Sequence, residues 1–222
     1  MENFTIHQLK EVKMKNLGTP TIYRNVREIV APEHTAFVVW DVQNALVDRS
    51  FNKEEFVRNL KQFIQAARDS NVPIIYTKIT PLPRHIESPF RMYMQMKRAG
   101  LDDPEKLPLF MAVGSPEAEI YSEVGPKDND IVFNKHTASV FVGTHFEYMM
   151  RNKGIDTILF TGISTEMGIA SSARDAVNRG FYTVVVNDCV SSGNKEMHES
   201  TLKILESICV VVSSQEIMKE WK

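Results

Sequence analysis

Six short apolar runs, rich in β-branched residues, recur along the chain and predict buried strands. They cover residues 36–40, 73–77, 131–133, 157–161, 182–186 and 208–212. Runs that are apolar on both faces are typical of parallel strands covered by helices on each side. The pattern therefore predicts one parallel sheet in the interior of the protein.

Longer stretches with helical spacing of apolar residues separate most of these runs, at residues 53–70, 144–153, 165–179 and 195–206. Gly154 and Gly180 each stand between a helical stretch and the next strand, where a left-handed C-terminal cap is expected. The alternation predicts an α/β fold with three layers: a doubly wound, Rossmann-like sheet of six mainly parallel strands flanked by helices.

Two regions depart from the alternation within the single domain that we expect over residues 1–222: an N-terminal extension, 1–33, and an insertion, 81–130. An insertion of this length usually has a function, so we expect a lid or an oligomer contact. A solvated excursion with its own short helices is the alternative. The apolar residues of the insertion favour an interface, and we therefore expect a homo-oligomer, either a dimer or a tetramer. These residues are Met92, Met94, Met96, Leu107, Leu109, Phe110 and Met111.

Composition and charge narrow the class of function. The 222 residues are 43% hydrophobic and 24% charged, and a net charge of -2 offers no basic surface for nucleic acid or an anionic membrane. The N-terminus lacks the apolar core of a signal peptide, and no run reaches transmembrane length. With two cysteines, Cys189 and Cys209, both expected to be structural, we expect a cytoplasmic protein acting on a small molecule.

Polar residues that follow the predicted strands are the candidates for chemistry, because ligands bind beyond the carboxyl ends of a parallel sheet. Asp41 and Lys135 each end a strand, and Gly168 follows another by a few residues. The aspartate can transfer a proton and the lysine can stabilise developing negative charge. The ammonium should lower the pKa of Asp41, whereas an apolar wall including Trp40 and Phe141 should raise it.

Three sequence blocks resemble the signatures of the isochorismatase-like hydrolases: FVVWDVQNALVD, FNKHTASVFVGT and TGISTEMGIASSARDAVNRGFYTVVVNDCVSS, together covering about residues 35–192. That family includes isochorismatases, nicotinamidases, and carbamoylsarcosine and ureidoacrylate amidohydrolases. The resemblance implies a six-stranded parallel sheet, a homo-oligomer, Asp41 as the acid/base and Lys135 as the catalytic lysine. It further implies a cis peptide at Ile163-Ser164, whose neighbouring N–H groups form an oxyanion hole.

Gly168 marks the departure from the amidohydrolases, which carry a cysteine nucleophile at the position it matches. Isochorismatases resemble this chain in having glycine there, since they cleave a vinyl ether by protonation. We therefore expect Asp41 to act as a general acid in ether or vinyl ether cleavage of a small anionic metabolite. The alternatives are an amidohydrolase that uses activated water and a catalytically silent ligand-binding protein.

The remaining candidates concern substrate binding. Thr165 is expected to be a helix N-cap, which places Gly168 in a first turn able to hold an anionic oxygen. Arg84 and Arg91 are candidates for a bidentate contact with a substrate carboxylate. The full set of predicted substrate-binding residues is Gln43, Arg84, Arg91, Phe141, Ile163, Ser164 and Thr165. His85 and Glu87 lack a third ligand, so no metal and no cofactor are expected.

Overall fold

The structure, a computed structural model, describes residues 21–222, so the first 20 residues of the predicted extension lie outside the described residues. A six-stranded sheet runs through the molecule in the order β3-β2-β1-β4-β5-β6, with every neighbouring pair parallel. The predicted α/β class is confirmed. The strands are β1 (Thr35–Trp40), β2 (Ile74–Ile79), β3 (Ile131–Lys135), β4 (Thr157–Ile163), β5 (Tyr182–Ser191) and β6 (Val210–Val212).

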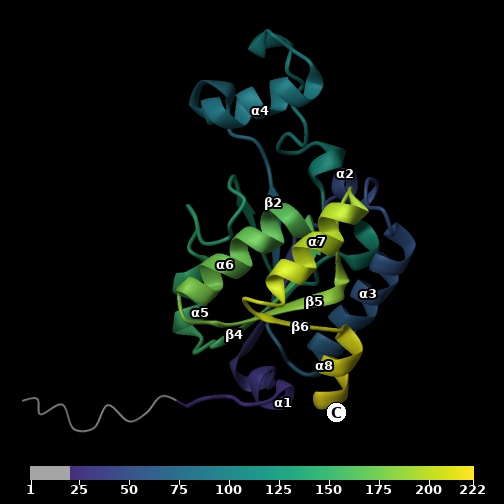
Figure 1. The fold of residues 1–222 in the computed structure, drawn as a ribbon, viewed down its shortest axis with the longest axis vertical. Coiled ribbons are helices and arrows are strands. Elements are labelled where there is room, and N and C mark those ends of the chain that lie inside the picture. Colours follow the sequence, from purple (N-terminus) through teal and green to yellow (C-terminus); the bar gives the residue numbers. More distant parts are fainter. Residues whose placement is uncertain (1–20) are drawn as a thin grey trace, which may run out of the picture.

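Helices cover both faces of this sheet (Figure 1). Successive side chains of β1 point to opposite faces: Phe37 and Val39 pack in one apolar cluster with α3, while Ala36 and Val38 pack in another with α5 and α6. The helices are α1 (Val26–Ile29), α2 (Asn44–Val47), α3 (Lys53–Asp69), α4 (Pro89–Ala99), α5 (Phe146–Asn152), α6 (Ala170–Asn178), α7 (Lys195–Leu205) and α8 (Ser214–Glu220). No helix of residues 21–222 has the length and apolar character needed to cross a membrane.

The predicted elements recur with two changes. Gly154 and Gly180 have φ values of 67° and 78°, the left-handed conformation expected after a helix. The predicted helix 165–179 is divided into a π-helical turn, Thr165–Ile169, followed by α6. The fifth strand extends to Ser191, beyond the predicted run 182–186. Cys189 therefore lies within β5, whereas the shorter run placed it after the strand.

The strand order reverses between β1 and β4, which are adjacent although the chain forms β2 and β3 between them. From β1 the chain moves outward to β2 and β3, and from β4 it moves the other way to β5 and β6. A doubly wound sheet opens a crevice at such a switch point, beyond the carboxyl ends of its strands. Asp41 follows directly from β1 and therefore lies at that point.

The first part of the insertion 81–130 extends away from the sheet, with α4 far from the helical layers (Figure 1), whereas Val124 near its end packs in the core cluster that includes α3. Besides α4 it forms short 3-10 turns at Arg84–Ile86, Pro104–Lys106, Pro116–Ala118 and Ser122–Val124. Its apolar residues range widely in exposure: Leu107 and Met111 are buried, while Phe90, Tyr93 and Leu109 are exposed. The remaining residues of the predicted interface are partly buried; they are Met92, Met94, Met96 and Phe110. The insertion thus has short helices of its own and leaves several large apolar side chains uncovered.

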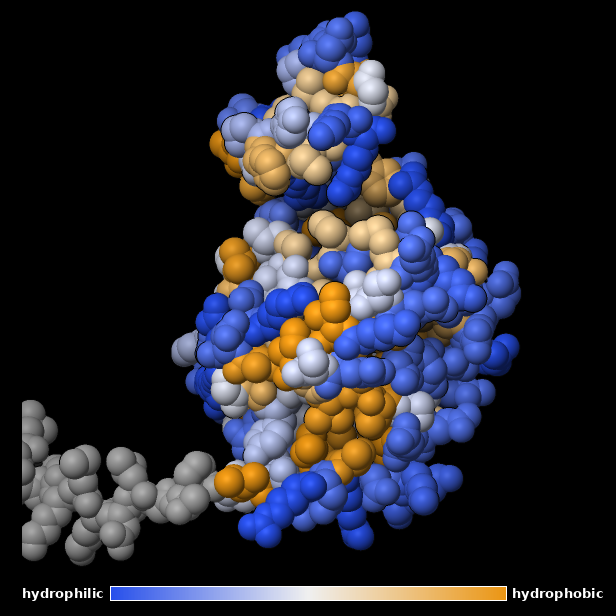
Figure 2. Space-filling view, in the orientation of Figure 1, coloured by the Kyte–Doolittle hydropathy of each residue, from blue (hydrophilic) through white to orange (hydrophobic). Residues whose placement is uncertain are grey.

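A second apolar area lies on the main body. Figure 2 shows apolar side chains gathered over the part of the surface where Figure 1 draws α6, α7 and β6. Val177 of α6 and Ile204 of α7 are among the exposed large apolar residues, and the valines of β6 are only partly buried. Since β6 is an edge strand, this area combines apolar side chains with an open edge of the sheet.

Candidate active site

Asp41 and Lys135 form a buried ion pair at the carboxyl edge of the sheet. The Nζ of Lys135 lies 2.5 Å from Oδ2 of Asp41, and only 1% and 2% of the two residues are exposed. Lys135 ends β3 and Asp41 follows β1, so the pair joins two strands that are separated in the sheet by β2. The convergence of these two predicted residues on one place is therefore present in the structure.

Thr77 of β2 completes the contacts of the carboxylate. Its Oγ1 donates a hydrogen bond of 2.6 Å to Oδ1 of Asp41 and accepts one from the backbone N–H of Asp41 at 3.2 Å. Asp41 itself has a φ of 44°, a left-handed conformation that is uncommon for a residue other than glycine. The backbone N–H and Oδ1 of Asp41 are thus held by β2 and its Oδ2 by β3.

Burial decides the electrostatics of this pair. It raises the pKa of Asp41 above its usual value, although the ammonium of Lys135 and the hydrogen bonds from Lys135 and Thr77 act in the opposite direction. Burial likewise lowers the pKa of Lys135, against the opposing charge of Asp41. Both shifts favour neutral side chains, so burial brings the proton affinities of the two groups closer together.

Trp40 and Gly168 lie beside the pair. The Nζ of Lys135 is 3.8 Å from the centroid of the Trp40 ring. Gly168 is buried in the π-helical turn after β4, as expected for a residue of the first turn, and its Cα faces the Trp40 indole. The predicted site residues Asp41, Lys135 and Gly168 are connected through this one tryptophan.

The turn that follows β4 has the cis peptide expected at Ile163-Ser164. The N-cap prediction for Thr165 is wrong, because Ser164 occupies the cap position and Thr165 lies inside the turn. The Thr165 hydroxyl is engaged elsewhere: Oγ1 donates to the carbonyl of Ser191 at 3.0 Å and lies 2.8 Å from Nδ1 of His198. Its role in the structure is to join the turn to β5 and α7.

Three predicted binding residues make contacts within the fold. The buried Gln43 side chain donates to the carbonyls of Ile79 and Ala118, and its Oε1 accepts from the N–H of Ile79. Arg84 donates to the backbone carbonyls of Pro104, Glu105 and Leu107, which ties the start of the insertion to its middle. Phe141 packs against Phe146 and Phe181. Binding of a substrate by any of these three remains a prediction.

Arg91 on α4 is a predicted binding residue whose charge affects the pKa of Lys135. Its Nη1 donates to the carbonyl of His136 at 2.9 Å and lies 3.7 Å from Oε2 of Glu87. His136 directly follows Lys135 in the chain, and the positive charge of Arg91 contributes to lowering the pKa of Lys135. The insertion therefore reaches the carboxyl edge of the sheet through this side chain.

Neither cysteine lies at the turn that holds Gly168. Cys189 is buried in the core, and burial raises the pKa of its thiol well above the usual value. Burial also raises the pKa of Cys209, to about 11. Both thiols are thus protonated at neutral pH, which agrees with the structural role expected of them. Within residues 21–222, His, Cys, Asp and Glu side chains do not gather in groups of three that could hold a metal ion.

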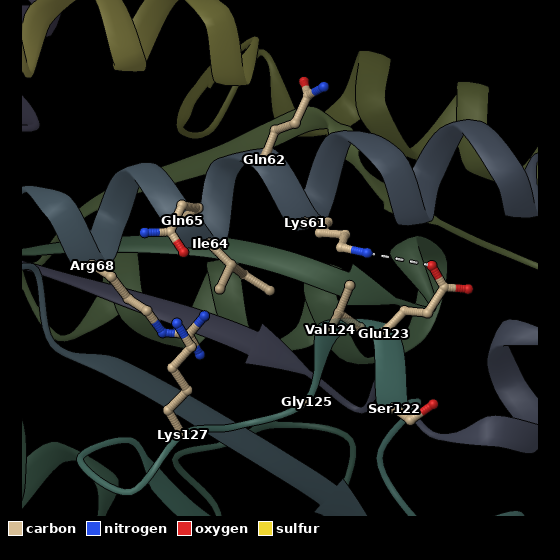
Figure 3. A pocket seen from close by; sticks show the side chains of 10 residues that line it. All are labelled: Lys61, Gln62, Ile64, Gln65, Arg68, Ser122, Glu123, Val124, Gly125 and Lys127. Carbon is tan, nitrogen blue, oxygen red and sulfur yellow. Dashed lines mark ion pairs between the residues drawn. The ribbon is translucent and has the colours of Figure 1, made fainter.

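A surface cavity of about 690 Å³ lies between α3 and residues 122–127, lined by residues other than the Asp41–Lys135 pair (Figure 3). Two of the cationic side chains at its rim have acidic partners: Arg68 lies 2.6 Å from Asp130, and Lys61 lies 3.7 Å from Glu123. The cavity has the volume of a small-molecule site but none of the residues that transfer protons in the buried pair.

Sequence reasoning missed Thr77 as a member of the site. It lies near the end of β2, between the two strands that supply Asp41 and Lys135, and the rule that selected those residues applies to it equally. The predicted run 73–77 ends at Thr77, so the position of this residue at a strand end was the signal that could have identified it.

Comparisons with known proteins identify the family and agree with the fold. Residues 35–217 match the family described as Isochorismatase domain. The ureidoacrylate amidohydrolase RutB of Acinetobacter baylyi is 30% identical over 204 residues, 83% of each chain. The maleamate amidohydrolase of Pseudomonas putida is 31% identical over 157 residues, 69% of this chain and 68% of that protein. The crystal structure of a cysteine hydrolase from Pseudomonas syringae pv. phaseolicola superposes with a TM-score of 0.73 at 20% identity, covering 87% of this chain and 94% of that one.

Proposed function

This chain belongs to the isochorismatase family of hydrolases, and we propose that it cleaves an ether or vinyl ether bond of a small anionic metabolite, with Asp41 as the proton donor. The observation that carries the proposal is the buried Asp41–Lys135 pair, in which burial raises the pKa of the carboxyl group. A carboxyl group that keeps its proton toward neutral pH can act as a general acid.

The surroundings of the pair favour a reaction without a covalent enzyme intermediate. Gly168 supplies no nucleophile, and the two thiols of the chain lie in β5 and next to β6 with raised pKa values. We infer that Asp41 protonates the leaving group or the double bond, and that water adds its hydroxyl group to the resulting cation and returns its other proton to Asp41. Lys135 stabilises the negative charge that the Asp41 carboxylate carries between these two proton transfers. Backbone N–H groups after Ile163-Ser164 would hold an anionic oxygen.

Arg91 supports the anionic character of the substrate. A guanidinium has five N–H donors in a planar fork that matches a carboxylate, and the Arg91 side chain is partly exposed beside the strand end that carries Lys135. Arg91→Lys should raise KM with little change in kcat, because lysine keeps the charge and loses the fork. Arg98→Lys, an exposed position on the same helix, is the matched control and should leave both constants unchanged.

Cleavage of a C–N bond by activated water is the second candidate function. It is favoured by the names of two relatives, a ureidoacrylate and a maleamate amidohydrolase. A panel of vinyl ethers, amides and ureides separates the two candidates, and amide turnover without ether cleavage would reverse our order of preference.

Asp41→Asn tests the site under either chemistry. The substitution keeps the shape of the side chain and removes the acidic proton of the carboxyl group, so turnover should be lost, whereas Asp69→Asn, at an exposed position on α3, should keep it. Near-normal activity of Asp41→Asn would contradict the assignment. A metabolite that raises the melting temperature without ever being consumed would instead identify the silent ligand-binding protein.

A further inference from the structure

We propose that Trp40 is a positioning residue of this site: its indole holds the Lys135 ammonium in place and, through the same packing, requires glycine at position 168. The proposal rests on the assigned role of the Asp41–Lys135 pair but on no particular substrate or bond.

The Trp40 indole leaves no space for a side chain at position 168. A Cβ built on Gly168 would lie 2.0 Å from Nε1, 2.4 Å from Cε2 and 2.7 Å from Cζ2 of Trp40, distances that real Cβ atoms do not show. Gly168 does not have a positive φ, so its backbone conformation is open to other residues. The indole therefore occupies the place where any side chain at position 168 would begin, and glycine is required there for space.

Trp40 has little freedom to move away. It is the last residue of β1, in register with Gly162 of β4, and only 1% of it is exposed. A Cβ on Gly162 would lie 2.0 Å from the Trp40 carbonyl oxygen, so the two backbones are in close contact. Because its backbone is held in the sheet and its ring is enclosed in a close-packed interior, the indole cannot retreat from Gly168 without disturbing its neighbours.

The other contact of the indole is the ammonium of Lys135, 3.8 Å from the ring centroid. The face of an indole attracts a cation, most strongly where water is excluded. The remaining partners of this ammonium are Asp41 Oδ2 at 2.5 Å and the Thr137 carbonyl at 3.3 Å, with Arg91 as the opposing positive charge. Trp40 thus contributes to keeping Lys135 charged and aimed at Asp41.

A double-mutant cycle tests the coupling between positions 40 and 168. Gly168→Ala should lower the urea midpoint of unfolding, and the same substitution should cost little in a Trp40→Leu background, where the space is free. Rescue of a Gly168→Ala protein that does not fold alone would be the strongest form of this result. An equal loss in both backgrounds, or failure of the double variant where Trp40→Leu folds, would overturn the proposal.

The lysine side-chain NMR signal of Lys135, assigned by its loss in Lys135→Met, tests positioning directly. Trp40→Leu should remove the ring-current shift of this signal and move its titration to lower pH, since the ammonium loses the indole face; Trp40→Phe should retain part of both effects. A merely structural role would leave the titration of Lys135 unchanged in Trp40→Leu, even though the ring-current shift is lost with the ring, and an unchanged titration would overturn the proposal. Neither readout requires a substrate, so the result is independent of which bond the enzyme cleaves.

Discussion

Thr77→Val is a sharp perturbation of the proton-transfer pair. Valine keeps the β-branched shape of threonine in β2 and removes the hydroxyl that donates to Asp41 Oδ1 over 2.6 Å. A hydrogen bond to the ionised carboxylate favours that form, so its loss should raise the pKa of Asp41 further in the direction set by burial. Thr77→Ser keeps the hydroxyl and is the matched control.

The magnitude follows from the charge and burial of the bond. A hydrogen bond to a charged group contributes about 1.5–3 kcal/mol, and Thr77 is fully buried beside a carboxylate that is itself 2% exposed. The ionised form of Asp41 should therefore lose about that much stabilisation in Thr77→Val, whereas the protonated form loses less. The native state of the variant therefore binds the Asp41 proton more tightly than the wild-type native state does, while the unfolded chains bind it equally. The stability that the variant loses relative to wild type grows as pH rises through the titration of Asp41.

The side-chain carboxyl carbon of Asp41, assigned by its absence in Asp41→Asn, reports the titration by NMR. Its midpoint should move to higher pH in Thr77→Val and stay near the wild-type midpoint in Thr77→Ser. Urea unfolding across the same pH range should show the two variants diverging at the alkaline end. Identical titrations of Asp41 in the two variants would refute the reasoning, because the hydroxyl would then have no part in setting the proton affinity.

Two further predictions concern the helices and the insertion. Asn194 caps α7 by accepting the N–H of Met197 at 3.0 Å, so Asn194→Ala should lower the free energy of unfolding by about 1 kcal/mol in urea titrations, while Asn194→Ser should largely preserve it. The exposed apolar residues of the insertion, with those over α6 and α7, predict a homo-oligomer; light scattering at micromolar concentration should give a mass above 25.3 kDa, and a stable monomer would contradict it.

The sequence allowed the fold to be predicted where one residue pattern fixes both an element and its surroundings. Valine-rich strands between amphipathic helices fit only a covered parallel sheet, and the structure has that sheet. The end of β5 was hidden because Asn187 and Asp188 interrupt the valine run. Asp188 is tolerated there because its carboxylate accepts hydrogen bonds from the N–H and Oγ of Ser214, a partner that the local pattern does not reveal.

The sequence predicted the site residues that lie at strand ends, but it did not predict contacts between residues far apart in the chain. Asp41 and Lys135 were identified because a rule of sheet topology brings such positions together. The contact of Trp40 with Gly168 joins residues 128 positions apart, and one sequence contains no signal for that pairing. Thr165 was assigned to a cap from its residue type, whereas its hydroxyl bonds to Ser191 and His198 on other elements.

The base of the insertion has a consequence for how enzymes with other substrates could arise from this one. Gln43 closes residues 80–117 into a loop by bonding to Ile79 on one side and Ala118 on the other, and an antiparallel bridge pairs Gln43 with Ile120. A replacement segment needs to match this clamp and the contact of Arg91 beside Lys135, because the strands that carry Asp41 and Lys135 are already joined below both. We therefore expect residues 80–117 to be exchangeable as a unit while the Asp41–Lys135 pair keeps its geometry.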